Sequence, residues 1–186
     1  WKMLAEAGFP SVLVDLDLRK SVLKDRLEFK SEGEIQGLDY YLSGLSEYQN
    51  VVYETNISNG YIVPVSNLLE NPSALLEDPR MEELLDRLAE DYRYVIIDSP
   101  PLDSVADGAL IASLCDGAII VVRSGMTSRR LVKQSIQQLE RVGCRLLGTV
   151  LNRVETKSRA YQKYYGKYGN YYSDYYGGHG AEKKEG

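Results

Sequence analysis

Two aspartates follow a short apolar run near the start of this 186-residue chain, in the stretch VLVDLDLR at residues 12–19. Because side chains alternate along an extended strand, Asp15 and Asp17 should point to the same side. Two carboxylates at one strand end repel each other unless a cation or a basic group neutralises them. Arg19 is that group in a purely structural interpretation. The functional alternative is a Mg²⁺ ion carrying phosphate, because Mg²⁺ favours one or two carboxylates plus substrate oxygens.

A third acid ends another apolar run. Asp98 follows the strand-like residues 94–97 (YVII) and precedes Ser99-Pro100-Pro101. An apolar strand that ends in a single aspartate is typical of the Walker B pattern, which holds Mg²⁺ in P-loop NTPases. A cap on the following turn explains a lone aspartate equally well. Two neighbouring strands that both end in acids favour the cation, because the negative charge at one sheet edge is otherwise uncompensated.

Two further polar residues have two interpretations each. Asn152 follows the last apolar run, where it could hydrogen-bond a nucleobase edge or merely end the strand. Asp107 lies near the start of a predicted helix, and a helix-start role is favoured over a catalytic one. The sequence offers no Cys or Ser nucleophile paired with a folded His, so it does not support a hydrolase triad.

The elements that would position these acids alternate between strands and helices. Each strand is a short continuous apolar run, typical of a parallel sheet buried on both faces. Pro79 begins a helix with apolar residues at helical spacing, and Asn59-Gly60 marks a turn between two β-rich segments. The sequence predicts an α/β fold with a mostly parallel sheet and helices on both faces. The predicted strands are 11–16, 51–54, 61–65, 94–97, 118–122 and 146–151, and the other predicted helices are 1–7, 37–44, 103–115 and 127–142.

Composition narrows the function classes. The net charge of −5 argues against general nucleic-acid binding. Cys115 and Cys144 lack metal-ligand spacing and are typical of reduced core residues in a cytosolic protein. No apolar run reaches the length of a membrane span and no signal peptide is visible, so membrane association is expected through a partner or a further segment. Trp1 begins the chain in what reads as mid-helix, and we therefore expect upstream sequence.

A change of composition after Ser158 divides the chain into a domain at 1–156 and a tyrosine-rich tail at 157–186. The tail has too few large apolar side chains to offset its ordering entropy, which predicts disorder. It could stack on single-stranded nucleic acid, have no defined chemistry, or accept phosphate, and a nucleotide site in the same chain favours phosphate. The candidate acceptors are Tyr161, Tyr164, Tyr165, Tyr168, Tyr171, Tyr172, Tyr175 and Tyr176.

The stretches VLVDLDLR and YVIIDSPP, together with the terminal tyrosine cluster, resemble the bacterial tyrosine kinases (BY-kinases) of capsule and exopolysaccharide systems. The segments NPSALLEDPRMEELLDRL and VVRSGMTSRRLVKQSIQQL resemble the same family. Either acidic motif alone is shared with the wider deviant-Walker ATPases of cell division and plasmid partition. The combination with the tail is more specific.

The resemblance implies a P-loop NTPase-like fold of the deviant Walker type that uses ATP and Mg²⁺. Asp15 and Asp17 match the Walker A′ acids, which help to place Mg²⁺ and activate the attacking tyrosine hydroxyl. Asp98 matches the Walker B acid and Arg19 the arginine that closes the A′ motif, while Asn152 matches an adenine-contacting Asn of the related ATPases. The tail tyrosines match sites of autophosphorylation in trans.

The resemblance also implies partners: a ring of identical subunits that comes apart on phosphorylation, a transmembrane polysaccharide co-polymerase as activator, and a tyrosine phosphatase. The expected location is the cytoplasm, at the inner face of the membrane. The Walker A loop, G-x-x-x-x-G-K-[ST], is missing from this sequence, so we expect it upstream and expect the fragment by itself to bind ATP poorly. The alternatives are a partition-type ATPase switch of the MinD/ParA kind and a non-catalytic regulatory module that lost its P-loop.

Overall fold

The computed structural model describes residues 1–23, 33–102 and 107–155. The chain forms two compact units, the first comprising residues 1–118 and 133–147, and the second residues 119–132 and those from 148 onward. The predicted disorder of the tail and its eight candidate phosphoacceptor tyrosines lie outside the described residues. The domain boundary at 156 therefore stays a prediction.

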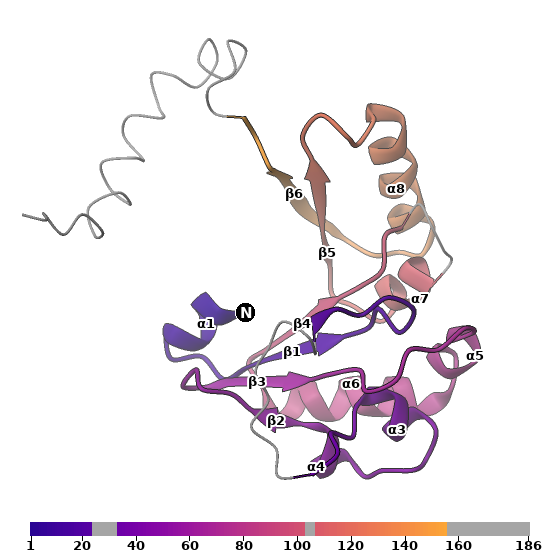
Figure 1. The fold of residues 1–186 in the computed structure, drawn as a ribbon. Helices are drawn as coiled ribbons and strands as arrows, with labels where there is room; N and C mark the ends of the chain where they lie inside the picture. The colour runs from indigo at the N-terminus through magenta and orange to yellow at the C-terminus, as the bar shows by residue number, and fades with distance from the viewer. Residues whose placement is uncertain (24–32, 103–106, 156–186) are drawn as a thin grey trace, which may run out of the picture. The chain divides into compact units, whose positions relative to one another are not determined.

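A four-stranded sheet organises the first unit, in the order β2-β3-β1-β4 (Figure 1). The central strand β1 (Ser11–Asp15) pairs in parallel with β3 (Gly60–Val63) on one side and β4 (Tyr94–Asp98) on the other. The edge strand β2 (Tyr53–Glu54) runs antiparallel to β3. The predicted turn produces this reversal, because Asn59 adopts a left-handed backbone conformation (φ 60°) directly before β3.

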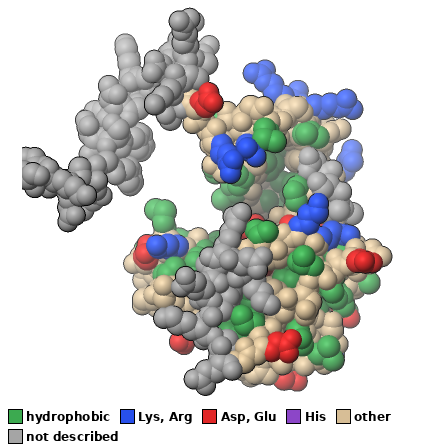
Figure 2. All heavy atoms as spheres, viewed as in Figure 1, with side chains coloured by type: hydrophobic (Ala, Val, Ile, Leu, Met, Phe, Trp, Pro, Cys, Tyr) green, Lys and Arg blue, Asp and Glu red, His purple; other side chains and the backbone are tan. Residues whose placement is uncertain are grey.

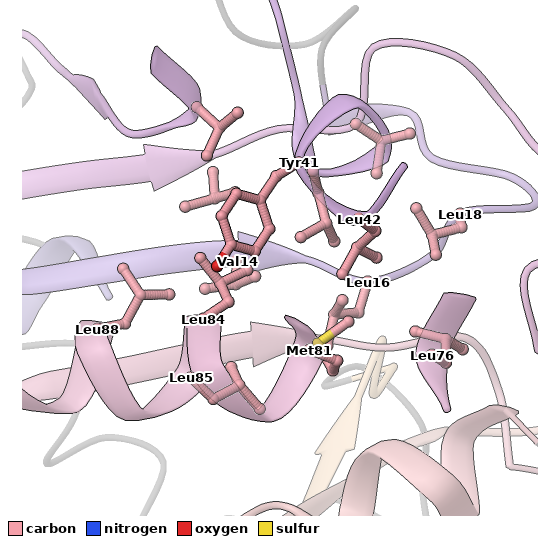
Figure 3. Close-up of a cluster of buried hydrophobic side chains, with 14 of the residues drawn as sticks. Val14, Leu16, Leu18, Tyr41, Leu42, Leu76, Met81, Leu84, Leu85 and Leu88 are labelled. Carbon is pink, nitrogen blue, oxygen red and sulfur yellow. The ribbon is translucent and has the colours of Figure 1, made fainter. Parts of the chain in front are cut away.

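One face of this sheet carries the core (Figure 3). Val14 and the two leucines beyond the strand, Leu16 and Leu18, are each at most 1% exposed and lie on the same side by alternation. Many of the other side chains of this cluster come from α3 (Leu38–Leu42), α5 (Ser73–Leu76) and α6 (Pro79–Asp91). The apolar stripe predicted for the helix at Pro79 is confirmed, since Met81, Leu84, Leu85 and Leu88 are all buried.

Short elements complete the first unit. Helix α1 (Lys2–Glu6) contacts β1 and β3 through a side that buries Ala5, and the chain leaves it through Gly8 in a left-handed conformation (φ 91°). Residue 51, predicted to be in a strand, belongs instead to α4 (Tyr48–Val51). Helix α7 (Asp107–Ser113) lies within the helix predicted over 103–115 and ends two residues before the predicted end.

Strands β5 (Ala118–Arg123) and β6 (Leu146–Asn152) form a separate two-stranded sheet, linked by helix α8 (Arg129–Arg141). The Ala118 amide donates to the Arg145 carbonyl (2.8 Å) and the Ser124 amide donates to that of Asn152 (2.9 Å). From the first bond to the second, the residue number rises along both strands, so β5 and β6 are parallel, as predicted.

The second unit has a basic surface although the whole chain is acidic. Its described residues include four arginines and a single acid, Glu155, and Figure 2 shows Lys and Arg side chains gathered over this part of the molecule. The arginines are Arg123, Arg129, Arg130 and Arg153, all of them exposed. Across the described ranges, the helices include none that is both long and apolar enough to span a bilayer.

Candidate active site

Asp15 and Asp98 lie side by side at the carboxyl ends of two adjacent parallel strands. They are direct partners in the register of β1 and β4, where strands run about 4.8 Å apart. The next amide, that of Leu16, donates a 2.8 Å hydrogen bond to the Asp98 carbonyl, which continues the pairing beyond the strand. The structure thus brings together two of the acids that the sequence placed at one sheet edge. Ligands of open α/β sheets bind at this edge.

Asp15 is the more constrained of the two acids, with 1% of its surface exposed. Its carboxylate accepts hydrogen bonds from the Ser21 hydroxyl and from the Asp17 amide, the latter at 3.2 Å. Burial raises the pKa of Asp15, the two hydrogen bonds oppose that rise, and the negative charges of Asp98 and Asp17 add to it. A bound cation would relieve the repulsion among these carboxylates.

Asp17 is half-buried on the turn that follows β1, and its carboxylate accepts the Lys20 amide at 3.0 Å. Asp98 is exposed. In residues 1–23, 33–102 and 107–155, no group of three or more His, Cys, Asp or Glu side chains is arranged to hold a metal ion. A Mg²⁺ ion bound here would need few protein ligands, because Mg²⁺ fills most positions with water and phosphate oxygens. The oxygen-only donor set of Asp15 and Asp98 fits that ion.

Arg19 is engaged by protein groups on two other elements. Its Nε donates to the Asp107 carboxylate at 2.7 Å and its Nη1 donates to the Glu70 carbonyl at 2.7 Å. The other oxygen of Asp107 accepts the Ser73 hydroxyl at 2.8 Å. The Arg19 hydrogen bond holds the pKa of Asp107 below its ordinary value, against the opposing effect of burial. A contact between Arg19 and nucleotide phosphate stays a prediction.

The helix-start role of Asp107 stays a prediction, because residues 103–106 lie outside the described residues. Sequence reasoning missed the role of Asp107 as the acceptor for Arg19. It is the first residue of α7 and only 3% exposed. No spacing rule links it to Arg19, because the two residues are 88 positions apart. The usable signal would have been a helix-start aspartate in a chain that has an arginine just beyond its acidic strand end.

Asn152 is the last residue of β6, in the second unit. Its side-chain oxygen accepts the Arg153 amide at 2.8 Å. Arg153 has a left-handed backbone conformation (φ 53°), so the Asn152 side chain supports the turn that ends the strand. This contact agrees with the strand-ending interpretation, and the nucleobase contact remains a prediction.

A shallow cavity of about 550 Å³ lies beside β2. The residues that line it are Glu34, Gln36, Gln49, Asn50, Val52, Tyr53 and Glu54. None of the predicted site residues that the structure describes is among them. The cavity therefore adds nothing to the acidic strand ends, and the candidate active site is built on the paired ends of β1 and β4.

Comparison with known proteins places the chain in a family. A family model described as an AAA domain matches residues 2–150. The tyrosine-protein kinase CpsD of Streptococcus agalactiae is 38% identical over 161 residues, a stretch that covers 87% of this chain and 69% of that protein. The chain thus spans about two thirds of the length of this curated relative.

Solved structures agree on the fold. The chimerical protein CapA2B2 superposes with a TM-score of 0.76 at 31% identity, covering 82% of this chain and 66% of that one. The cell division ATPase MinD of Pyrococcus furiosus superposes with a TM-score of 0.68 at 22% identity, covering 85% of this chain and 65% of that one. At 22% identity, the MinD likeness shows the P-loop NTPase-like fold alone. The likenesses to CpsD and to CapA2B2 also rest on sequence identity, at 38% and 31%. The chain belongs to the bacterial tyrosine kinases, the BY-kinases, within the wider AAA domain family.

Proposed function

We propose that this chain is the catalytic domain of an ATP-dependent protein-tyrosine autokinase. The observation that carries the proposal is the pairing of Asp15 with Asp98 at the ends of β1 and β4, in a chain 38% identical to a named tyrosine-protein kinase. A buried carboxylate beside two other acids is a costly arrangement in the absence of a cation. The tyrosine-rich sequence after Ser158 supplies acceptors in the same chain.

The proposed chemistry is phosphoryl transfer, in which bound MgATP supplies the phosphoryl group and leaves as ADP. Asp15 and Asp98 would hold the metal. Asp17 would accept the proton of the attacking tyrosine as its O–H bond breaks and its oxygen bonds to phosphorus. Most of the acceleration would come from positioning and charge neutralisation.

The remaining roles belong to the whole protein. The tail of one subunit would be phosphorylated by a neighbour in a ring, and a tyrosine phosphatase would reverse the modification. A transmembrane polysaccharide co-polymerase would recruit the domain to the inner face of the membrane and activate it, and phosphorylation would regulate capsule or exopolysaccharide polymerisation and export. The fragment by itself would be inactive, because its sequence has no Walker A loop.

The test uses the full-length protein with its activator, ATP and Mg²⁺, and reads phosphotyrosine by blotting and by mass spectrometry of the tail. We expect phosphate on the tail tyrosines and its loss in Asp98→Ala. The matched control is Asp86→Ala, because Asp86 is an exposed acid on α6. ATP hydrolysis without phosphotyrosine in the wild-type protein would contradict the kinase and favour the partition-type ATPase. Absence of both activities would favour a regulatory module.

A further inference from the structure

We propose that Asp107, with Ser73, is a positioning residue that locks Arg19 and thereby fixes the turn that carries Asp17. This inference rests on the proposed function, because it assigns a role to residues around the same nucleotide site. It also changes the role of Arg19. The arginine would act on the acids through the backbone and not as a ligand for phosphate.

The first step is the geometry around Asp107. Both of its oxygens are engaged, one by Arg19 Nε at 2.7 Å and one by the Ser73 hydroxyl at 2.8 Å. Only 4% of the Asp107 side chain and 28% of the Arg19 side chain are exposed. An ion pair screened from water in this way holds its geometry better than a surface pair.

The second step is what the pair joins. Arg19 lies on the turn after β1, Asp107 is the first residue of α7, and Ser73 is the first residue of α5. The guanidinium also reaches the Glu70 carbonyl at 2.7 Å, on the segment that leads into α5. A planar group with donors in a fixed fork is suited to bridging several elements at once. One side chain therefore ties three segments of the first unit together.

The third step is the position of the acids within this frame. Backbone bonds hold the turn on both sides of Asp17: the Leu16 amide donates to the Asp98 carbonyl, and the Leu69 amide donates to the Leu18 carbonyl, each at 2.8 Å. Arg19 is the next anchor along the chain. The Asp17 amide in turn donates to the Asp15 carboxylate at 3.2 Å. A shift of the turn would therefore move two of the three acids together.

The consequence concerns metal-dependent binding. If the network fixes Asp15 and Asp17, its loss should weaken the part of nucleotide affinity that requires Mg²⁺. Affinity without Mg²⁺ should hardly change, because in this proposal the network acts on the acids and makes no contact with the phosphates. A direct contact between Arg19 and phosphate predicts the opposite, since an arginine that binds an anion does so with or without a metal.

The test measures ADP binding by calorimetry on full-length protein, with Mg²⁺ and with EDTA, for Asp107→Asn and Arg19→Lys. We expect the Mg²⁺-dependent gain in affinity to fall about tenfold in each variant, since small misplacements near the chemistry are costly. Affinity for ADP in EDTA should stay within about twofold of wild type. With Mg²⁺, the double variant should bind ADP no more weakly than the single variant with the lower affinity, because the two residues act as a unit. Matched controls are Asp86→Asn and Arg93→Lys, both at exposed positions.

Three outcomes would overturn the inference. The first is loss of ADP affinity in EDTA for Arg19→Lys with Asp107→Asn unchanged, which would assign Arg19 to phosphate. The second is additive losses in the double variant, and the third is an unchanged Mg²⁺ dependence in both variants. Far-ultraviolet circular dichroism and urea unfolding verify that each variant is folded. Ser73→Ala removes one hydrogen bond of the network, so we expect it to lower the Mg²⁺-dependent affinity less than the other two variants do. ADP binding is measurable whether or not the wild-type protein phosphorylates tyrosine, so failure of the proposed function is distinguishable.

Discussion

Asp15 and Asp98 are direct partners across the parallel pairing of β1 and β4, so two carboxylates of distant sequence positions share one strand end. Asp15 is almost completely buried there, whereas Asp98 is exposed. The pair is therefore asymmetric, with one acid buried and hydrogen-bonded by Ser21 and the Asp17 amide, and the other at the surface. The asymmetry gives a prediction about stability as well as one about binding.

Asp15→Asn should stabilise the ligand-free protein at neutral pH. Burial raises the pKa of Asp15 above its ordinary value of 3.8, so folding disfavours the charged form. The stabilising contribution of Asp15 is fully present below its unfolded pKa and is lost as the pH rises through the raised folded value. Asparagine removes the charge, so its advantage in urea unfolding should be larger at pH 7 than at pH 3.

The same substitution should abolish the Mg²⁺-dependent part of nucleotide binding, because it removes a proposed metal ligand. Asp86→Asn serves as the control in both measurements, since it changes an exposed acid to the same amide. If ligand-free Asp15→Asn is less stable at pH 7 than wild type, the hydrogen bonds to the Asp15 carboxylate outweigh the cost of burying its charge, and the prediction is wrong.

Gly37→Ala should destabilise the first unit. Gly37 precedes α3, where the Leu38 amide donates to the Pro64 carbonyl at 2.7 Å, and an added Cβ would meet that carbonyl and lie 2.6 Å from the Ser66 amide nitrogen. Both obstacles are backbone atoms, so we expect a loss of roughly 1–3 kcal/mol in the free energy of unfolding. Urea denaturation measures it.

Gly148→Ala is the matched control for that change, because a Cβ at Gly148 would meet nothing within 4 Å. Gly148 also has no positive φ, so alanine fits its backbone. We expect its unfolding free energy to stay within about 0.5 kcal/mol of wild type. Equal losses in the two variants would refute the steric explanation.

Leu84→Ala should cost about 2–5 kcal/mol in unfolding free energy, through lost burial and the cavity left behind. Leu84 is fully buried at the centre of the α6 stripe, within the cluster that covers β1 (Figure 3). Leu68→Ala removes the same atoms from a side chain that is 56% exposed, and should have little effect. Chemical denaturation of both variants gives the comparison, and similar losses would place the core elsewhere.

Much of the fold could be predicted because local pattern and tertiary structure agree. Apolar runs that end in acids gave the positions of β1 and β4, and the direct pairing of Asp15 with Asp98 follows once those strands are neighbours. Alternation predicted a common side for Asp15 and Asp17, and the burial of Leu16 and Leu18 on the other side is consistent with it. The strand predicted at 51–54 contains β2, but the sequence did not predict that β2 runs antiparallel to β3.

The contacts that sequence could not predict join polar residues far apart along the chain. Arg19 meets Asp107, and buried Asp39 accepts the Ser66 amide at 2.7 Å and the Asn67 amide at 3.1 Å. Such pairs depend on how loops close over the sheet, and no periodicity encodes that. From sequence alone, a charged residue in a loop is expected to be exposed to solvent, and only the fold shows which group it contacts. The roles of Asn152 and the tail tyrosines stay predictions.

The antiparallel strand β2 has a consequence for self-association. It ends one side of the four-stranded sheet and contains only two residues, Tyr53 and Glu54. An exposed strand recruits a second chain through a row of unsatisfied amides and carbonyls, and a strand this short offers too few of them. The shortness of β2 should therefore disfavour strand addition on that side of the sheet, a property that matters for a domain proposed to work in crowded assemblies of identical copies.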